Sequence, residues 1–310
     1  MDSPLIVIVG PTGVGKTEVS IYLAKKMNGE IISADSRTFY RGMDIGTAKP
    51  TKEELKLIPH HLVDIADPDQ HLNLAVFQQH VDAIIGEIRT RHHIPFLVGG
   101  TGQYIRAITN NWSPPTISPD PRLRIIFEEL ANEKGKDFLH QALRRLDPEA
   151  AKIIDPRNLR RTIRALEVIF STGKRFSSQR IKKPGPNNFI VVGLTRPRLE
   201  LYARIDRRID EMFTKGLINE VRSLLSAGYS PDLPSFSAIG YSECINVIAG
   251  NFDELDAIEE IKRKTRIYVR RQTNWFKPSD PNIHWFDISS HPLYEIEKFL
   301  RSEINSPINT

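Results

Sequence analysis

The chain has 310 residues, of which 40% are apolar and 26% are charged, and its formal net charge is +5. This length and composition exclude a small disulfide-stapled module and a disordered tail, and they predict one large or two modest globular domains. The single cysteine, Cys244, excludes an intrachain disulfide framework and a metal site with several cysteine ligands. We expect a cytoplasmic protein without a membrane segment, because the N-terminal apolar run spans only Leu5 to Val9.

The first 110 residues alternate predicted strands with predicted helices. Short β-branched or apolar runs predict strands, and apolar residues at helical spacing predict helices. The predicted strands are Leu5–Val9, Glu30–Ala34, Leu62–Ile65 (the weakest) and Ile94–Val98, and the predicted helices are 16–27 and 74–91, the second capped by Asn73. Such alternation is typical of a mostly parallel sheet.

Two proline-rich breaks, at 113–121 and 182–186, enclose a segment with helical patterns only. Helices are predicted there over 122–134, 137–146 and 158–172. After the second break, strands are predicted at Phe189–Leu194 and Ile283–Asp287, and helices over 198–215, 217–227 and 253–276. The middle segment is therefore predicted to be a helical insertion in a sheet domain.

The segment between the first strand and the first helix matches the pattern GxxxxGK[ST]. Its residues are Gly10, Pro11, Thr12, Gly13, Val14, Gly15, Lys16 and Thr17. In this pattern backbone N–H groups and the helix N-terminus surround a phosphate, the lysine neutralises it, and the hydroxyl can ligate Mg²⁺. The sequence predicts an α/β fold: a P-loop NTPase-like parallel-sheet core, 1–114 and 187–310, with a helical insertion domain, 115–186.

Polar residues follow two other predicted strands, at the sheet edge where ligands bind in open α/β folds. Asp35 follows the second strand and is a candidate base or metal ligand; the alternative is an aspartate that caps a turn. Thr101 follows the strand at 94–98 and can offer its hydroxyl to a phosphate or cap the next helix. The histidine pairs at 60–61 and 92–93 lack metal-ligand spacing, so Mg²⁺ is the only metal expected.

Positive charge is concentrated in two zones. The segment from Arg157 to Arg208 contains fourteen Lys/Arg residues and three acidic residues, and 262–277 contains seven Lys/Arg residues and no acid. This distribution predicts a polyanion-binding surface, against the alternative of solvated helix faces. In the predicted helix 158–172, arginines lie opposite an apolar stripe and have few acids for i,i+4 pairing, which favours contacts with phosphates. Near 262–277, aromatic residues suit base stacking, although core packing is the alternative for Trp275.

Seven segments occur in one order: GPTGVGKT, SADSRTFYRGMDIGTAKP, HHLVDIADPD, PFLVGGTGQY, RALEV, AIGYSE and RRQTNWF. Together they resemble the tRNA dimethylallyltransferase family, over residues 5 to 277. The resemblance implies transfer of a dimethylallyl group from dimethylallyl diphosphate to N6 of the adenosine at position 37, next to the tRNA anticodon. The implied partners are tRNA and dimethylallyl diphosphate with Mg²⁺, and we expect a monomer. No cysteine follows Cys244, so the zinc finger of eukaryotic members is not expected and the resemblance is to the bacterial form.

The resemblance also implies roles for individual residues. The P-loop, Gly10 to Thr17, would hold the diphosphate, with Mg²⁺ on Thr17. The implied catalytic residues are Lys16, Asp35 as the base near the adenine amine, Thr101, and Arg208 facing the diphosphate. The implied tRNA contacts are Asp35, Ser36, Arg37, Thr38, Thr101, Arg124, Arg160, Arg161, Thr162, Ile163 and Arg164. Gln103 stands where the family more often has an apolar residue, and the sequence assigns it no role.

Three other functions compete with this interpretation. One is prenyl transfer to free adenine nucleotides, which uses a similar phosphate loop and aspartate but needs no RNA-binding surface. Another is a P-loop small-molecule kinase, which would transfer a γ-phosphate from ATP. The last is a nucleic-acid-binding P-loop protein without chemistry, which leaves Asp35 at the strand end unexplained.

Overall fold

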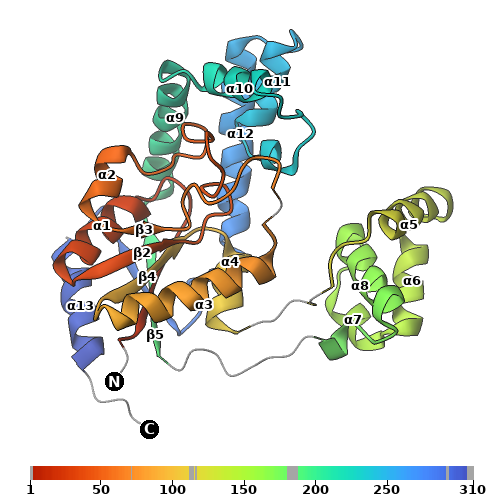
Figure 1. The fold of residues 1–310 in the computed structure, drawn as a ribbon, viewed down its shortest axis with the longest axis horizontal. Helices are drawn as coiled ribbons and strands as arrows, with labels where there is room; N and C mark the ends of the chain where they lie inside the picture. The colour runs from red at the N-terminus through yellow and green to blue at the C-terminus, as the bar shows by residue number, and fades with distance from the viewer. Residues whose placement is uncertain are drawn as a thin grey trace. The chain divides into compact units, whose positions relative to one another are not determined.

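The computed structural model of the chain describes residues 3–70, 72–111, 115, 117–179, 188–290 and 293–305 (Figure 1). The chain divides into two compact units: Met1–Ile108 with Pro186–Thr310, and Thr109–Gly185. The predicted boundary positions 114, 186 and 187 lie outside the described residues, as does the break at 182–186.

The first unit is built on a six-stranded sheet of order β3-β2-β4-β1-β5-β6, and every neighbouring pair is parallel. The strands are β1 (Leu5–Val9), β2 (Gly29–Ser33), β3 (His60–His61), β4 (Ile94–Gly99), β5 (Phe189–Thr195) and β6 (Ile283–Asp287). This architecture confirms the predicted α/β class. Because β1 lies between β4 and β5, the loop that follows it leaves from the middle of the sheet.

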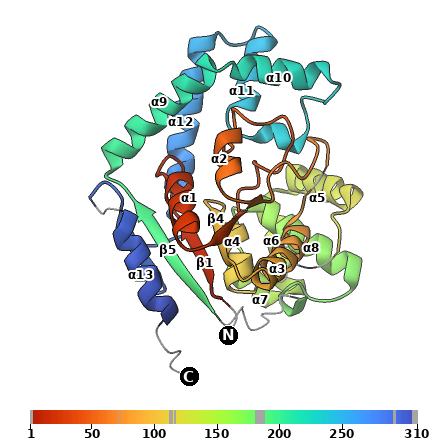
Figure 2. The ribbon, with the colours of Figure 1, turned by 60° about the vertical axis from the view of Figure 1, so that its left-hand side comes forward.

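Helices cover the sheet. Alternate strand residues, among them Ile6, Ile8 and Val192, share a core cluster with the apolar residues of α1 (Lys16–Lys26) and α13 (Leu293–Asn305). Figure 2 shows these two helices beside β1 and β5. α3 (Leu74–Thr90) contacts β2 and β4 and begins at the predicted cap, since the Asn73 side chain accepts the N–H groups of the first turn. Every residue of β1 is buried, which explains its unbroken apolar sequence.

The C-terminal part of this unit is helical: α9 (Arg198–Thr214), α10 (Leu217–Ser226), α11 (Tyr241–Ile248) and α12 (Glu254–Gln272). α9 and α12 lie side by side (Figure 1) and are joined by ion pairs from Lys262 to Asp210, 2.9 Å, and from Arg266 to Asp206, 2.5 Å. Among the described residues, no helix is long and apolar enough to cross a membrane.

The second unit contains α5 (Pro121–Lys134), α6 (Lys136–Leu146), α7 (Pro148–Ile153) and α8 (Leu159–Thr172). Their apolar faces form a separate core that includes Phe127, Leu139, Leu143 and Leu166. Phe127 also packs edge-on against Phe170, at 5.6 Å between ring centroids. The helical segment therefore has a core of its own.

The predicted strand at Leu62–Ile65 is wrong. The strand is His60–His61, and the chain then turns at Leu62 (φ +60°) and Asp64 (φ +55°), a left-handed conformation that a strand cannot contain. Several short helices were not predicted separately: α2 (Lys52–Leu57), α4 (Gly102–Thr109), α7, α11 and α13. α12 ends at Gln272, four residues before the predicted helix end.

A buried carboxylate at the start of β2 ties three segments together. Glu30 accepts hydrogen bonds from Arg91 (2.8 and 2.9 Å) and pairs with ring nitrogens of His61 (2.6 Å) and His93 (2.7 Å). Burial alone would raise the pKa of Glu30, but the hydrogen bonds from these partners outweigh it and hold the pKa at about 2. The ionised carboxylate is therefore part of the folded state.

We expect Glu30→Gln to lower the free energy of unfolding at pH 7 by about 2 kcal/mol, because the neutral amide loses the charge-assisted hydrogen bonds that the buried carboxylate makes with Arg91, His61 and His93. The carboxylate stabilises the fold fully above its unfolded pKa of 4.5, and this contribution is lost as pH falls from 4.5 toward 2. Urea unfolding at pH 7 and pH 3 should show the difference between variant and wild type shrinking at pH 3. Replacing the exposed Glu53 by Gln is the matched control, and an equal effect there would contradict the assignment.

Candidate active site

A cavity of about 460 Å³ opens at the carboxyl end of the sheet. Its floor includes Ile31 and Ser33 of β2 and Val98 of β4. P-loop residues line one side, α9 supplies a row of arginines, and the 47–50 loop supplies a less polar wall. The lining residues taken up below are Thr12, Gly13, Lys16, Thr17, Asp35, Thr47, Ala48, Pro50, Arg204, Arg207 and Arg208.

The P-loop packs directly against α9. Gly13 has a φ of +80°, and a Cβ there would lie 2.7 Å from Cγ1 of Ile205, so only glycine fits. The Val14 side chain is fully buried in the core, which leaves only its backbone for ligand binding. Arg204 donates from Nε to the Gly13 carbonyl at 3.2 Å. The loop conformation therefore depends on a helix about 190 residues further along the chain.

Lys16 is half-buried under the loop. Its Nζ donates to the carbonyl oxygens of Gly10, at 3.0 Å, and Pro11, at 2.9 Å. Burial lowers the pKa of Lys16 to about 8, against an opposing effect of Asp35 and a smaller lowering by Arg208. An anion that enters the cavity would stabilise the charged form of a lysine with such a pKa.

Arg208 provides a second half-buried cation that lines the same cavity. Its Nη2 donates to the Thr12 hydroxyl at 3.0 Å, and burial lowers its pKa while Asp35 raises it. Within the described part of the chain, its buried Nε has no hydrogen-bond partner. Buried guanidinium N–H groups normally have an acceptor, so this geometry fits an anionic ligand.

Asp35 lies directly after β2 and lines the same cavity as the two cations. Its Oδ1 accepts the Arg37 N–H at 3.0 Å, which is the turn-capping contact considered from the sequence. In the described residues no hydrogen bond reaches Oδ2. The carboxylate is therefore a turn cap and also faces the cavity.

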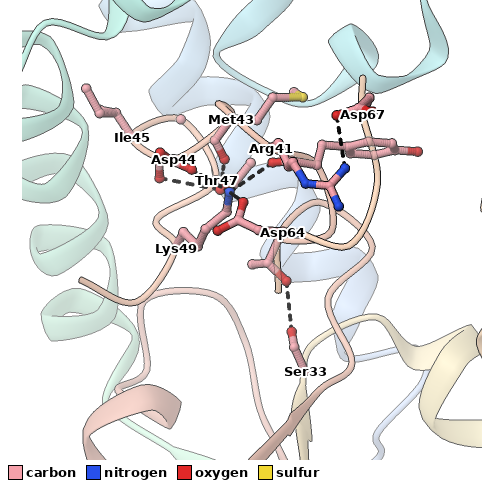
Figure 3. Close-up of polar contacts among 12 residues, drawn as sticks. Ser33, Arg41, Met43, Asp44, Ile45, Thr47, Lys49, Asp64 and Asp67 are labelled. Carbon is pink, nitrogen blue, oxygen red and sulfur yellow. Dashed lines mark hydrogen bonds and ion pairs between the residues drawn. The ribbon is translucent and has the colours of Figure 1, made fainter. Parts of the chain in front are cut away.

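The neighbours of Asp35 are held by other parts of the unit. The Thr38 hydroxyl pairs with Ser33 at 2.8 Å (Figure 3), and Thr38 is buried. The Arg37 guanidinium donates to the Pro234 and Ser235 carbonyls and to the Ser237 hydroxyl, so it ties the turn to a distant 3₁₀ segment (Pro234–Ser237). Ser36 is half-buried.

The 41–50 loop contains the residues of the less polar wall, and a buried lysine holds this loop in place. Figure 3 shows Lys49 at the centre of this loop, donating to the Tyr40 carbonyl at 2.9 Å, to Asp64 at 2.5 Å and to Asp44. Only 3% of the Lys49 side chain is exposed. Its contacts fix the loop that presents Thr47, Ala48 and Pro50 to the cavity.

Thr101 does not line the cavity. It begins α4, where its carbonyl accepts the Tyr104 N–H at 2.9 Å. Its side chain lies near Tyr268 of α12, whose pKa burial and Asp35 raise to about 12, against hydrogen bonding with Thr101 and Gln272. Gln272, which the sequence did not single out, contacts both the P-loop and the turn after β4. Gln103 is exposed in the first turn of α4.

The second unit contains the residues that the resemblance relates to tRNA. Arg160 and Arg161 are exposed on α8, as their spacing predicts. Thr162 and Ile163 are buried, Ile163 in the helical core, and a contact between tRNA and these two residues stays a prediction. They lie on the packed face of the same amphipathic helix.

Arg124 and Arg164 each form an ion pair inside the helical unit, and their contacts with tRNA stay a prediction. Both pair with the fully buried Glu167, at 3.3 and 2.8 Å, and Arg164 also donates to the Ile117 carbonyl at 2.6 Å. Glu167, a buried acid of α8, thus pairs with two of the arginines that the resemblance relates to tRNA.

The basic zone 262–277 is largely neutralised. Its first four cations all pair with acids of α9, α11 or the preceding turns of α12, namely Lys262 with Asp210, Arg263 with Glu260, Lys264 with Glu243 and Arg266 with Asp206. Phe276 is buried, whereas Trp275 is 37% exposed and packs on Gly102, so the core alternative applies to the phenylalanine. The charge count over 262–277 did not include these acids, because all four lie outside that range of residues.

A glycine loop with its lysine at the carboxyl edge of a parallel sheet, facing a half-buried arginine and a carboxylate, defines a P-loop-type protein that binds phosphate groups. The family model described as IPP transferase matches residues 38–279, and that described as isopentenyl transferase matches residues 3–64. The chain belongs to the IPP transferase family.

Relatives and solved structures agree with this membership. A tRNA dimethylallyltransferase of Roseiflexus sp. (strain RS-1) is 50% identical over 280 residues, which cover 90% of this chain and 92% of that relative. The structure of a tRNA isopentenylpyrophosphate transferase from Bacillus halodurans is similar with a TM-score of 0.73 and 43% identity, covering 97% of both chains. A eukaryotic dimethylallyltransferase acting on tRNA matches with a TM-score of 0.81 and 28% identity, over 99% of this chain and 81% of that one.

We expect anion binding at the P-loop to be linked to proton uptake. The pKa of Lys16 is about 8 without a ligand, and a bound diphosphate must raise it, so above pH 8 binding takes up protons and affinity falls as pH rises. Calorimetric titration with inorganic diphosphate at pH 8.5, in two buffers of different ionisation enthalpy, measures the uptake. In Lys16→Met the number of protons taken up on binding should fall to what the diphosphate itself contributes. An unchanged proton uptake in that variant would assign the uptake to another group.

Proposed function

We propose that this protein transfers the dimethylallyl group of dimethylallyl diphosphate to N6 of adenosine 37, next to the anticodon, in tRNA. The observation that carries the proposal is one cavity lined by the Lys16 and Arg208 cations and by the Asp35 carboxylate, all three half-buried. Membership of the IPP transferase family, with relatives named tRNA dimethylallyltransferase, supports the choice of donor and acceptor.

The reaction needs a stabilised leaving group and a better nucleophile. The N6 lone pair attacks C1 of the allyl group, the C1–O bond breaks, and its electron pair leaves on the diphosphate. Asp35 hydrogen-bonds the amine and accepts the N6 proton as the C–N bond forms. The carboxylate position at a strand end, beside the cation pair, suits this role.

The P-loop and α9 would stabilise charge as it develops on the diphosphate. Lys16 and Arg208 supply two half-buried cations, and the first N–H groups of a helix such as α1 have no intrahelical partner and can donate to an anion. Such preorganised electrostatic stabilisation is usually the largest contribution to catalysis. The less polar wall of Ala48, Pro50 and Val63 suits the hydrocarbon part of the donor.

Thr17 fits Mg²⁺ because its hydroxyl belongs to the cavity lining at the start of α1. Among the described residues no group of three or more acidic, histidine or cysteine side chains could hold a metal. A cation bound through one hydroxyl, substrate phosphates and water matches the coordination that Mg²⁺ prefers. When bound, Mg²⁺ would add charge stabilisation of the leaving diphosphate.

The tRNA must bring its adenine out of the anticodon-loop stack to reach a buried cavity. The exposed Arg160 and Arg161 of α8, in a unit with its own core, would hold the RNA backbone by phosphate contacts. This division assigns the chemistry to the sheet unit and part of the RNA binding to the helical unit.

The direct test is incubation of the protein with unmodified tRNA, dimethylallyl diphosphate and Mg²⁺, followed by mass analysis of the nucleosides. An adenosine that carries one dimethylallyl group, mapped to position 37, is the expected product. Parallel reactions with AMP and with ATP as phosphate donor test the nucleotide prenyltransferase and the kinase. Product from AMP alone, or phosphate transfer alone, would overturn the proposal, as would tRNA binding without product.

We expect Asp35→Asn to slow the chemical step by roughly 10²–10⁴-fold while leaving tRNA affinity within a few-fold, because the amide has the same shape but cannot take a proton. Single-turnover rates with prebound tRNA measure the step. A rate within a few-fold of wild type would remove Asp35 from the mechanism.

We expect Arg160→Gln with Arg161→Gln to weaken tRNA binding and to flatten the slope of log K against log salt by up to roughly two units, since each lost phosphate contact contributes about 0.7–0.9. The KM for dimethylallyl diphosphate should not change. Arg164→Gln is the matched control: its partners are Glu167 and Ile117, so it should lower thermal stability more than the salt slope. A larger change of the salt slope in Arg164→Gln than in the Arg160/Arg161 double variant would contradict the assignment.

A further inference from the structure

We propose that Gln272, the last residue of α12, is a positioning residue that fixes the P-loop and, through Thr12, the half-buried Arg208 that faces the diphosphate. Gln272 is 4% exposed, and both ends of its amide are used. Its Oε1 accepts the Thr12 N–H at 2.9 Å, and its Nε2 donates to the Gly100 carbonyl at 3.0 Å. One side chain thus joins three segments that are far apart in the sequence. As a statement about catalysis, this inference rests on the proposed function.

The bridge requires an amide of this length. It needs one acceptor and one donor at the same end of the side chain, which among the long side chains only glutamine provides. Asparagine is one methylene shorter, glutamate lacks the donor, and lysine lacks the acceptor. The Gly100 backbone comes so near that a Cβ there would lie 2.3 Å from Nε2. The turn after β4 and Gln272 therefore fit each other closely.

The bridge continues from Thr12 to Arg208. The Thr12 backbone N–H is held by Gln272, and its hydroxyl accepts Nη2 of Arg208 at 3.0 Å. Within the described chain, the buried Nε of Arg208 has no partner, so Thr12 is an important fixed point for this guanidinium. A shift of Thr12 would move the cation relative to the diphosphate.

The helix that carries Gln272 is itself anchored. α12 pairs with α9 through Arg266 and Asp206 and through Lys262 and Asp210, and α9 carries Arg208. The two helices thus hold the P-loop from both sides: α12 through the Gln272 amide, and α9 through Arg204 and Arg208. Rigid elements of this kind position a site more accurately than loops do.

The test compares Gln272→Met with wild type in two assays. Methionine keeps the length and the packing but removes the hydrogen bonds to Thr12 and Gly100, together with the one that Gln272 shares with Tyr268. Calorimetry with inorganic diphosphate and Mg²⁺ should show a Kd about tenfold higher, and single-turnover transfer to tRNA should slow by about ten- to a hundredfold. The Kd for tRNA and the cooperative unfolding transition should stay close to those of wild type.

A double-mutant cycle separates positioning from loss of stability. If Gln272 acts through Thr12 and Arg208, then Gln272→Met in an Arg208→Gln background should change the diphosphate Kd by less than about twofold. Full additivity of the two changes would overturn the proposal. Gly100→Ala is a second variant, which displaces the amide without altering Gln272; it should weaken diphosphate binding in the same way, and unchanged binding would count against the bridge.

Gln78→Met is the matched control, because Gln78 also donates to a backbone carbonyl, that of Ala107 at 3.0 Å, but lies between α3 and α4. Its diphosphate Kd should equal that of wild type, and an equal weakening would show a general loss of stability and overturn the proposal. The diphosphate assay does not depend on prenyl transfer. If wild type binds diphosphate but modifies no tRNA, the proposed function fails while the Gln272 bridge is still tested.

Discussion

The structure depends on holding two positive charges, Lys16 and Arg208, half-buried and close together at the carboxyl edge of the sheet. Burial disfavours the charged form of both groups, as their lowered pKa values show. The protein offsets this cost in part with the loop carbonyls, the Thr12 hydroxyl and the Asp35 carboxylate. The offset is incomplete, because Arg208 retains a buried nitrogen without a partner among the described residues. An anionic ligand would supply the acceptor that this nitrogen lacks.

The C-terminal helices follow from this constraint. A P-loop presented by β1 and α1 alone has a lysine and backbone N–H groups, but no arginine near the leaving group. α9 brings Arg204 and Arg208 to the loop, and the pairs between α9 and α12 hold it there. The acids of α9, such as Asp206, therefore serve the site indirectly, since they orient the helix that carries its cations.

The sequence predicted the parts of the fold that local pattern determines. The P-loop, the strands β1 and β4, the Asn73 cap and the amphipathic helix α8 are each specified by residues within about one turn or strand of each other. The errors concern distant contacts. Asp210 pairs with Lys262 and Glu243 pairs with Lys264, and both acids lie outside the counted segments, so a charge count in a sequence window overstated the free positive charge. Gln272 was missed for the same reason, because its partners lie 172 and 260 residues distant.

Pairing therefore divides the basic residues into those that hold the fold and those that remain for ligands. Arg164 and Arg266 satisfy buried or half-buried acids, and a phosphate that recruited them would have to compete with those carboxylates. Arg160 and Arg161 are exposed on α8, and Arg208 has a buried nitrogen left over. Unused hydrogen-bond capacity alone does not make a cation available, because Nε of Arg266 also lacks a partner among the described residues while that guanidinium pairs with Asp206. Positive charge in this sequence therefore indicates a polyanion surface only after the internal ion pairs have been subtracted.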